Sequence, residues 1–520
     1  MSNIFIIGSG LSAVSAAVAL VNRGHKPTIL DVGLGPEQEA VELKNELAGC
    51  LPGHPNCQAL DQLKQMDRAS ACGIPRKRWF GSDFPFRSLE KDCQVESVEA
   101  SMVRSYAEGG LSNVWGAALQ KVTASDVEQW PLALEELAPY YDQVLNFLDL
   151  NGNPATNRLP SLRLSLQARA LLDDLESHRQ KLARQGISYG PSQLAVRSQN
   201  GGPIPGCAYC GLCLSGCPYD CIYTAAGTLR QLREMGKIRY FPGLFVEKIL
   251  RTGNQLAVEV WNLHENRREA LEGSLILVGA GLLSTARISL ESLSYYDRPL
   301  TIRHSDMFTL PFLRFRGDAG VFTEALHTLS QVFIELEDLE ICARRVHLQV
   351  YTYNDLYLPL LESRFGAAGR LLHHPVRALV SRLLIIFGYL PSDVSSSIEI
   401  VLPSGGCRKV VLLGKPNARS VVASRKVAWR LLRRFREFGG IPLVFQMAAD
   451  LPGGGYHSGG LFPMSSEPVF PATDLLGRLP LFEHVHLIDA SVLPDVPAIP
   501  TAFTVMANAY RIASLCPVPE

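Results

Sequence analysis

The sequence predicts an α/β fold in which a parallel-sheet domain, assembled from distant segments, carries a second domain built on an antiparallel sheet. Three observations predict it: a glycine-rich turn between an N-terminal strand and a helix, two later apolar strands that end in small or acidic residues, and a central region of short β-rich runs. The 520 residues exceed the ~250–300 at which a single core stops growing, so more than one core is expected.

The N-terminal element is a strand that passes directly into a glycine-rich turn and a helix. Residues 4–7 are apolar, and the apolar residues after position 13 recur at helical spacing. Gly8 permits a tight turn, Gly10 leaves room for a pyrophosphate at the helix N-terminus, and Ala13 lets the helix pack closely on the strand. The residues expected beside the nucleotide are Gly8, Gly10, Leu11, Ser12 and Ala13.

A second strand, residues 27–30, ends in Asp31, 21 residues after Gly10. An acid at that position of a Rossmann-type domain can accept both ribose hydroxyls, and an acid rather than an arginine argues against a 2′-phosphate. The segment therefore predicts a dinucleotide site, with FAD and NAD both open at this point.

Further motifs lie in the middle and at the end of the chain. They are Gly109-Gly110-Leu111-Ser112-Asn113-Val114-Trp115-Gly116, Val278-Gly279-Ala280-Gly281, His457-Ser458-Gly459-Gly460 with Met464, and Ile488-Asp489-Ala490-Ser491 followed by a last helix. In this order they resemble the glucose–methanol–choline (GMC) family of flavin oxidoreductases, nearest its sugar and sugar-acid dehydrogenase branch. Residues 300–440 contain no motif of the family.

The resemblance implies FAD in a Rossmann-type FAD-binding domain combined with an antiparallel-sheet substrate domain. Histidines are few in the N-terminal half and none lies in an attachment motif, so we expect FAD to be held without a covalent bond. It also implies that the last helix directs its positive N-terminus at the pyrimidine edge of the flavin, which stabilises the anion on the reduced ring. By this resemblance, the residues near FAD besides the first turn and Asp31 are Gly110, Ser112, Asn113, Trp115, Val246, Gly279, Asp489, Ala490 and Thr501.

His457 falls at the family's catalytic histidine position. Members of the family oxidise an alcohol carbon by hydride transfer to flavin N5, and imidazole suits the base because its pKa lies near working pH. The family's second His or Asn is missing from residues 497–504, where Thr501 is the nearest polar candidate and a poorer base. The alternative for His457 is a buried histidine that supports a glycine-rich turn.

Four cysteines form a run, C-x2-C-x2-C-x3-C-P, that is typical of a ferredoxin iron–sulfur loop. They are Cys207, Cys210, Cys213 and Cys217. A 4Fe-4S cluster is favoured over zinc, because structural zinc sites usually present two C-x2-C pairs separated by a dozen or more residues. A 3Fe-4S cluster and a purely structural cluster stay open, and the substitutes for the fourth ligand are Cys221, Cys50, Cys57, Cys72 and Cys93.

The central β-rich runs are residues 308–315, 331–336, 346–353, 396–402 and 410–413. We expect them to form an antiparallel sheet under a substrate pocket. The predicted FAD-binding domain comprises residues 1–150, 200–300 and 450–520, with the iron–sulfur loop at 207–221. The substrate domain comprises 300–450 and part of 151–200, with candidate linkers at 151–160 and 198–206.

Two stretches, residues 370–387 and 426–438, mix arginines with apolar side chains. Such stretches lie on a membrane surface or face a phosphate, although most are solvated helix faces. If they are functional, the substrate would be lipid-linked, nucleotide-linked or otherwise phosphorylated, and the protein would contact a membrane peripherally.

The composition limits the remaining alternatives. Lys plus Arg (50) equals Asp plus Glu (50), which disfavours nucleic acid as a partner. Residues 4–7 are too short for a signal-peptide core, so we expect a cytoplasmic protein with reduced thiols. If it contacts a membrane, we expect that contact at the inner face of the membrane.

The predicted function is FAD-dependent oxidation of an alcohol on a carbohydrate, with an iron–sulfur cluster passing electrons to an acceptor or redox partner protein. One alternative is a flavin-dependent epimerase or isomerase without net redox change. Another is an electron-transfer flavoprotein without a small-molecule substrate.

Overall fold

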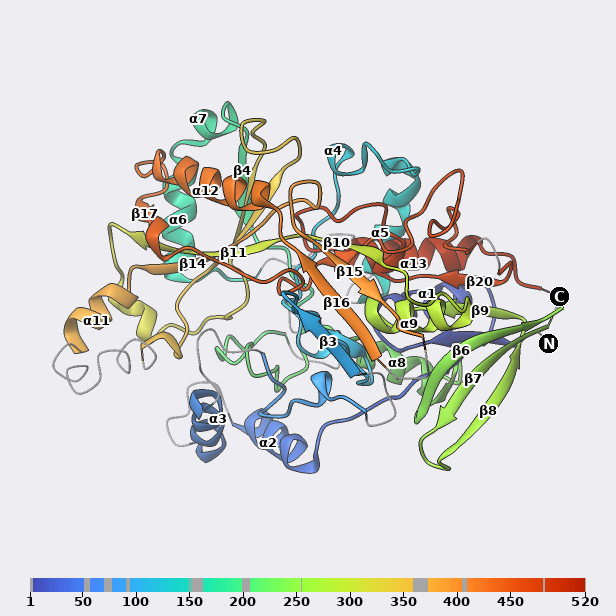
Figure 1. The fold of residues 1–520 in the computed structure, drawn as a ribbon. Coiled ribbons are helices and arrows are strands. Elements are labelled where there is room, and N and C mark those ends of the chain that lie inside the picture. The colour runs from blue at the N-terminus through green and yellow to red at the C-terminus, as the bar shows by residue number, and fades with distance from the viewer. Residues whose placement is uncertain are drawn as a thin grey trace.

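The computed structural model describes residues 3–50, 57–69, 77–89, 94–148, 150, 162–198, 206–253, 255–358, 373–404, 409–479 and 482–519. Figure 1 shows an elongated molecule in which both termini lie at one end, close to a parallel sheet. Strands and helices of the second half of the chain form most of the opposite end.

The parallel sheet has five strands in the order β20-β9-β1-β2-β5. Its strands are β20 (Val485–Leu487), β9 (Leu275–Val278), β1 (Ile4–Ile7), β2 (Thr28–Leu30) and β5 (Arg239–Phe241). Each adjacent pair is parallel. Every residue of β1 and β9 is buried, as expected for strands covered on both faces.

Helices cover this sheet and link its distant segments. The helix α1 (Leu11–Asn22) follows β1, and the C-terminal helix α13 (Ala502–Leu515) packs against α1 and α5 (Leu134–Leu148). Further helices are α8 (Ala225–Glu234) and α9 (Leu282–Ser292), and an antiparallel sheet of β6 (Leu244–Thr252), β7 (Gln255–Asn262) and β8 (Arg267–Gly273) projects beside them.

The second domain is built on an antiparallel sheet in the order β17-β11-β14-β13-β12-β4, with β18 also paired to β11. The strands are β17 (Gly440–Pro442), β11 (Met307–Arg314), β14 (Leu383–Tyr389), β13 (Val346–Tyr351), β12 (Val332–Leu336), β4 (Ile187–Pro191) and β18 (Ala448–Ala449). A separate core joins this sheet to α6 (Leu166–Glu176) and α12 (Ala418–Leu432).

A third, mixed sheet lies between these parts of the chain (Figure 1). Its order is β19-β10-β15-β16-β3, with only β16 and β3 parallel. The strands are β19 (Ser458–Gly459), β10 (Leu300–His304), β15 (Ser397–Val401), β16 (Lys409–Lys415) and β3 (Gln94–Val98).

The other helices are α2 (Gln38–Gly49), α3 (Gln58–Ala69), α4 (Ala124–Val127), α7 (Arg179–Ala183) and α11 (His373–Val380). Short 3-10 helices are η1 (Phe84–Phe86), η2 (Gly110–Asn113), η3 (Ala319–Phe322), η5 (Val444–Gln446) and η6 (Ala490–Val492). Within the described residues, none of the helices has both the length and the apolar character needed to cross a bilayer.

The predicted fold class is confirmed, with two corrections. The β-rich runs do form strands, but β15 and β16 belong to the mixed sheet rather than to the antiparallel one. Residues 383–387, expected within a basic amphipathic stretch, lie in β14 between β11 and β13. The candidate linker 151–160, residues 199–205 of the candidate linker 198–206, and Arg370 lie outside the described residues.

Candidate functional site

Two glycine turns face one another at the end of β1. Gly8 has φ +94°, and a Cβ there would lie 2.7 Å from the carbonyl oxygen of Gly279, so neither turn leaves room for a side chain at this contact. A Cβ on Gly10 would meet no atom within 4 Å, while a Cβ on Gly110 would lie 3.4 Å from the Cα of Gly10. Open space therefore remains beside the N-terminus of α1, where a pyrophosphate is expected to bind.

Asp31, at the end of β2, is held by two hydroxyl groups. Its Oδ2 accepts hydrogen bonds from the hydroxyl of Ser9, at 2.5 Å, and from that of Tyr240, at 3.1 Å. The Ser9 hydroxyl in turn accepts a hydrogen bond from the backbone N–H of Gly109. This contact links Asp31 to the glycine turn at residues 109–110. Burial raises the pKa of Asp31 to about 7, against the opposing effect of both hydroxyl donors. A bound ribose would give this carboxylate further donors.

The predicted residues of the 109–116 loop brace the loop itself. The Ser112 hydroxyl donates to the carbonyl of Gly109 and accepts the N–H of Ala225 at the start of α8. The Asn113 amide donates to the carbonyls of Glu108 and Gly110, and the indole N–H of Trp115 donates to the carbonyl of Tyr223. Their side chains thus fix the glycine turn, whose backbone is left to face the open space.

Two more predicted residues meet at the carboxyl end of β9. A Cβ on Gly279 would lie 3.0 Å from the hydroxyl of Ser12 and 3.1 Å from Ile488, so strand and helix approach closely here. Asp489 accepts hydrogen bonds from the Thr285 hydroxyl and the Ser491 N–H. Burial raises the pKa of Asp489.

Val246 is the residue predicted to lie on the adenine side. It lies buried in β6, and its carbonyl oxygen accepts the guanidinium of Arg287 at 2.6 Å. Arg287 also lies over the ring of Phe245, 4.5 Å from its centroid. The backbone of Val246 is therefore held by an arginine that the sequence analysis did not select.

The segment that carries His457 runs alongside the segment that carries Asp489. The N–H groups of Gly460, Phe462 and Met464 donate to carbonyls of residues 490, 491 and 492. A Cβ on Gly459 would lie 2.5 Å from the carbonyl oxygen of Ala490, so only glycine permits this approach. The two motifs, 32 positions apart in the sequence, therefore form one surface at the end of the parallel sheet.

The His457 imidazole stacks on the ring of Tyr389, with centroids 4.6 Å apart. Its Nδ1 is buried and has no hydrogen-bond partner among the described residues. Burial, followed by the nearby charges of His304 and His347, lowers the pKa of His457 to about 3. The imidazole is therefore neutral at physiological pH, and its pKa lies below the value near working pH that the sequence analysis expected of the base.

His304 and Ser305 hold the backbone of His457. The N–H of Ser305 donates to the carbonyl of His457 at 2.9 Å, and Nδ1 of His304 lies 3.1 Å from that oxygen and from the Ser458 hydroxyl. These contacts were not predicted, because His304 belongs to β10, 153 positions away, and no local pattern marks it. Tyr389 was missed for the same reason.

Thr501 precedes α13 and is 7% exposed. Its hydroxyl caps no backbone N–H of the helix. The structure records no hydrogen bond between Thr501 and His457, so it brings Thr501 to the start of the last helix without joining it to the imidazole.

The cysteine loop lies next to the 109–116 loop, since residues 207–221 lead directly into α8. The ammonium of Lys77 donates to the carbonyl of Trp115 and lies close enough to Cys213 and Cys217 for their charges to raise its pKa, although burial lowers it to about 8 overall. Within the described residues, however, no group of three or more His, Cys, Asp or Glu side chains is arranged to hold a metal ion. The thiols as placed do not match a metal site.

Other cysteines depart from expectation. Cys50 and Cys57 form a disulfide, so the prediction of reduced thiols is wrong for this pair, and neither is free as a substitute ligand. Cys221 donates its backbone N–H to the sulfur of Cys217, 3.2 Å away. Cys72 and Cys93 lie outside the described residues.

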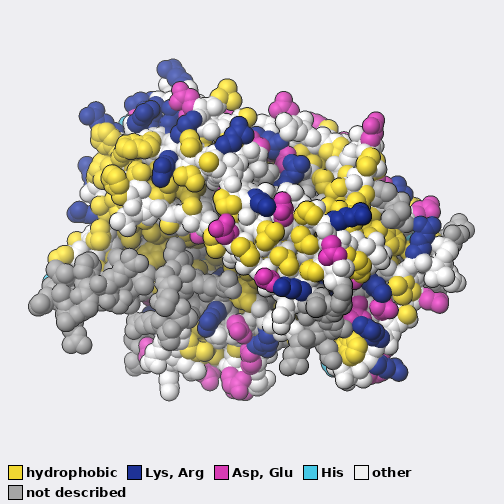
Figure 2. Space-filling model, in the orientation of Figure 1, with side chains coloured by type: hydrophobic (Ala, Val, Ile, Leu, Met, Phe, Trp, Pro, Cys, Tyr) yellow, Lys and Arg dark blue, Asp and Glu magenta, His cyan; other side chains and the backbone are white. Residues whose placement is uncertain are grey.

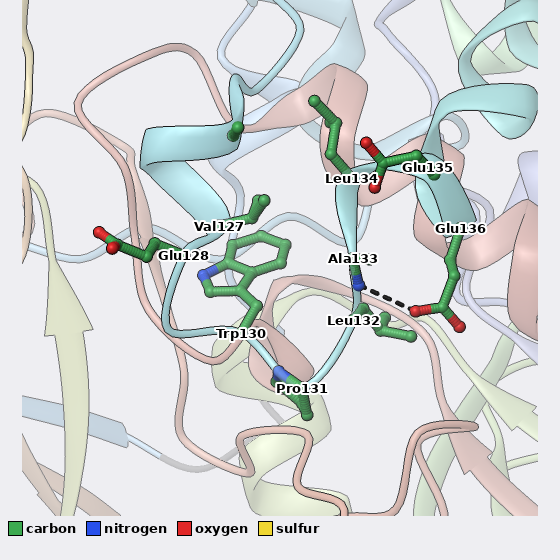
Figure 3. A pocket seen from close by; sticks show the side chains of 10 residues that line it. Val127, Glu128, Trp130, Pro131, Leu132, Ala133, Leu134, Glu135 and Glu136 are labelled. Carbon is green, nitrogen blue, oxygen red and sulfur yellow. Dashed lines mark hydrogen bonds between the residues drawn. The ribbon is translucent and has the colours of Figure 1, made fainter.

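A hollow of about 470 Å³ lies on the surface around Trp130 and Pro131 (Figure 3). Its lining comes from residues 124–136 alone and includes the carboxylates of Glu128, Glu135 and Glu136. Glu136 is engaged, because it accepts the N–H of Ala133 at 2.9 Å. None of the residues discussed above lines this hollow, so we do not assign the reaction to it.

Comparisons with known proteins identify the fold. No family model matches the chain, and no curated protein matches it by sequence. The crystal structure of pyridoxine 4-oxidase from Mesorbium loti superposes over 99% of this chain and 98% of that one, with a TM-score of 0.62. The chain shares the fold of pyridoxine 4-oxidase. At 14% identity this likeness shows the fold alone.

Proposed function

We propose that this protein binds FAD and oxidises an alcohol carbon, with His457 as the base. The observation that carries the proposal is the hydrogen-bonded pairing of residues 460–464 with residues 490–492, which joins the segment of His457 to the segment of Asp489, while the buried Nδ1 of His457 has no partner among the described residues. The GMC resemblance of the motifs supports it. Pyridoxine 4-oxidase, which has the same fold, is an oxidase by name.

The glycine turns fit a dinucleotide. Gly10 borders open space at the N-terminus of α1, and Gly110 faces it. Asp31 would hold the ribose of the adenosine half, and Asp489 would lie near the ribityl chain. When bound, FAD would take up two electrons and a hydrogen from the alcohol carbon.

The protein's own part in the reaction is to orient the alcohol and take its proton. His457 has a free Nδ1 and a neutral ring held by Tyr389 and by contacts to its backbone. Burial raises the pKa of Tyr389, and the nearby Tyr351 and Asp450 raise it further. His457 and Asp450 would offer hydrogen-bond partners to a hydroxyl-rich molecule, which supports a carbohydrate as the substrate.

An anaerobic absorption experiment tests the proposal. Simple alcohols and sugars are added to the flavin-loaded protein, and bleaching of the flavin band by a sugar is expected. The carbohydrate assignment fails if only non-sugar alcohols bleach the flavin. The oxidoreductase assignment fails if no compound does, or if product forms without an acceptor, as for an epimerase.

The glycine cradle provides a separate prediction. Gly110→Ala is expected to weaken FAD binding at least about tenfold, which corresponds to ~1.4 kcal/mol, because the new Cβ lies 3.4 Å from Gly10 in the space assigned to the pyrophosphate. Gly236→Ala is the control, since Gly236 also has positive φ but borders open solvent. Flavin retained per folded chain is the readout, and equal losses in both variants would contradict the cradle.

We also propose that Cys207, Cys210, Cys213 and Cys217 bind an iron–sulfur cluster, which would pass electrons to a redox partner. The ferredoxin spacing supports this, as does the position of Lys77 between the cysteine loop and Trp115. The thiols would have to move relative to the present arrangement. Iron and acid-labile sulfide are expected in anaerobically purified protein and absent from Cys210→Ala; zinc, or no metal, would contradict the cluster.

A further inference from the structure

Large hydrophobic side chains are exposed together over α12 and its neighbours. Figure 2 shows them as a yellow area, bordered by dark blue Lys and Arg, over the part of the molecule where Figure 1 places α12 and β17. Phe445 is 97% exposed, Val422 53% and Trp429 50%. The exposed side chains of this surface, here called the α12 surface, are Phe315, Val421, Val422, Trp429, Phe435 and Phe445.

These residues belong to one continuous surface. The helix α12 contacts both β17 and η5, which carries Phe445. Phe315 follows β11, donates its N–H to the carbonyl of Gly439, and lies edge-on to Phe435 with ring centroids 6.1 Å apart. The opposite face of α12, with Ala423, Val427, Ala428 and Leu431, is already buried in the core. The outward hydrophobic side chains therefore have no role in the packing of the helix.

The same surface is strongly basic. From residue 415 to residue 436 the sequence has eight Lys or Arg and no Asp or Glu, although the whole chain is neutral. Four of the eight have polar or ionic partners elsewhere: Lys415 pairs with Glu399, Lys426 with the carbonyl of Glu340, Arg430 with Asp338, and Arg434 with Gln185.

The other basic side chains of residues 415–436 are available to bind an external partner. Arg425 and Arg433 are exposed. Together with Val421 and Trp429 they recur at every fourth position, 421, 425, 429 and 433, and so lie on one face of the helix. No carboxylate among the described residues pairs with either side chain. Arg436 lies over the ring of Phe435. Cations and hydrophobic side chains thus alternate along one exposed helix face.

We propose that the α12 surface docks on an anionic lipid bilayer. A helix with Trp, Phe and aliphatic side chains between Arg and Lys lies in the interface of a membrane, where the apolar groups enter the acyl boundary and the cations meet lipid phosphates. Charge complementarity selects anionic lipid over neutral lipid, since each basic residue near such a surface adds about a fivefold preference. The exposed Phe and Trp favour lipid over nucleic acid, which would meet mainly cations.

The test is sedimentation of the flavin-loaded full chain with vesicles of phosphatidylcholine alone or with phosphatidylglycerol. Binding to the anionic vesicles is expected, with at least about tenfold weaker binding to the neutral ones. R425E/R433E is expected to lower the affinity for anionic vesicles at least about tenfold, and W429A/F445A to lower it even at low salt, where the cations act most strongly.

The matched control is R230E/M235A/K237E, which changes two cations and one exposed hydrophobic side chain at the end of α8. It is expected to bind like the parent chain. Flavin content and thermal melting show that each variant is folded, independently of catalysis. Binding to neutral vesicles as tight as to anionic ones, equal loss in the control, no binding to any vesicle, or preferred binding to an RNA oligonucleotide would overturn the proposal.

Discussion

His457→Ala is expected to lower kcat for flavin reduction by the alcohol about 10²–10⁴-fold, with flavin still bound. The imidazole is the proton acceptor in the proposed reaction, and its unpartnered Nδ1 has no structural hydrogen bond to lose. The glycine turns and Asp31 lie on other segments, so FAD binding should persist. Stopped-flow reduction of the flavin measures the effect directly.

A second buried histidine is the control for this variant. His486, in β20, also has its pKa lowered to about 4 by burial, and its Nδ1 lies 2.8 Å from the carbonyl of Leu476. His486→Asn is expected to leave flavin reduction within about threefold of the parent rate. Retained activity in His457→Ala would disprove the role of His457, and equal loss in both variants would show a structural effect.

The same imidazole determines the expected pH dependence. Because burial lowers the pKa of His457 to about 3, the folded protein keeps the base unprotonated well below the ordinary value of 6.5. An acid limb of kcat/KM assigned to His457 should therefore be absent between about pH 8 and pH 5. Below 6.5 the unfolded chain binds the proton first, so the stability contributed by this group falls as pH decreases towards 3.

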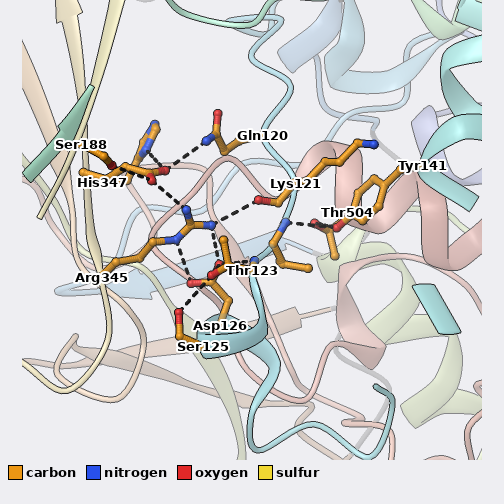
Figure 4. A network of polar contacts seen from close by, with 12 residues as sticks. Gln120, Lys121, Thr123, Ser125, Asp126, Tyr141, Ser188, Arg345, His347 and Thr504 are labelled. Atoms are coloured by element: carbon orange, nitrogen blue, oxygen red, sulfur yellow. Dashed lines mark hydrogen bonds and ion pairs between the residues drawn. The ribbon is translucent and has the colours of Figure 1, made fainter. Parts of the chain in front are cut away.

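Arg345→Met is expected to destabilise the protein by about 3–5 kcal/mol, because it leaves two buried carboxylates without their cation. The guanidinium of Arg345 pairs with Asp126 and with Glu335, and donates to the carbonyl of Lys121. All three charged groups are nearly inaccessible to water. Figure 4 shows the network extending through Thr123 and His347.

Thermal unfolding of the flavin-loaded protein checks this prediction, with an exposed arginine as the control. Arg267 forms ion pairs with Glu265 and Glu269 on the surface of the β6–β8 sheet. Arg267→Met is expected to cost at most about 1 kcal/mol, since exposed pairs are screened by solvent. Similar melting temperatures for Arg345→Met and the parent would show that the buried pairs contribute no net stability.

Local patterns predicted the nucleotide-binding part of the fold well. The strand, glycine turn and helix of residues 4–22 are adjacent in sequence, and their chemistry depends on neighbours within a few positions. Residues 383–389 were harder, because an apolar run next to arginines suits a membrane-facing helix as well as a buried strand. Its hydrogen-bond partners in β11 and β13, distant in sequence, make it a strand.

The contacts around His457 could not be predicted for the same physical reason. Tyr389 stacks on the imidazole from a strand of another sheet, and His304 holds its backbone from β10, which pairs with β19 but lies 153 positions away in the sequence. Arg345 likewise reaches Asp126 over 219 positions. The pairing of Asp126 with Arg345 has no local signature, whereas Asp31 follows from the Rossmann pattern, which places an acid at the end of the strand next to the glycine turn.

Identification of the cofactor tests the central claim most directly. The purified protein is heat-denatured, and the released small molecules are separated and identified by their absorption and fluorescence. The account predicts FAD at about one equivalent per folded chain, released without proteolysis. NAD in place of FAD, or a folded chain that neither retains FAD nor takes it up when supplied, would contradict a flavin-dependent oxidoreductase.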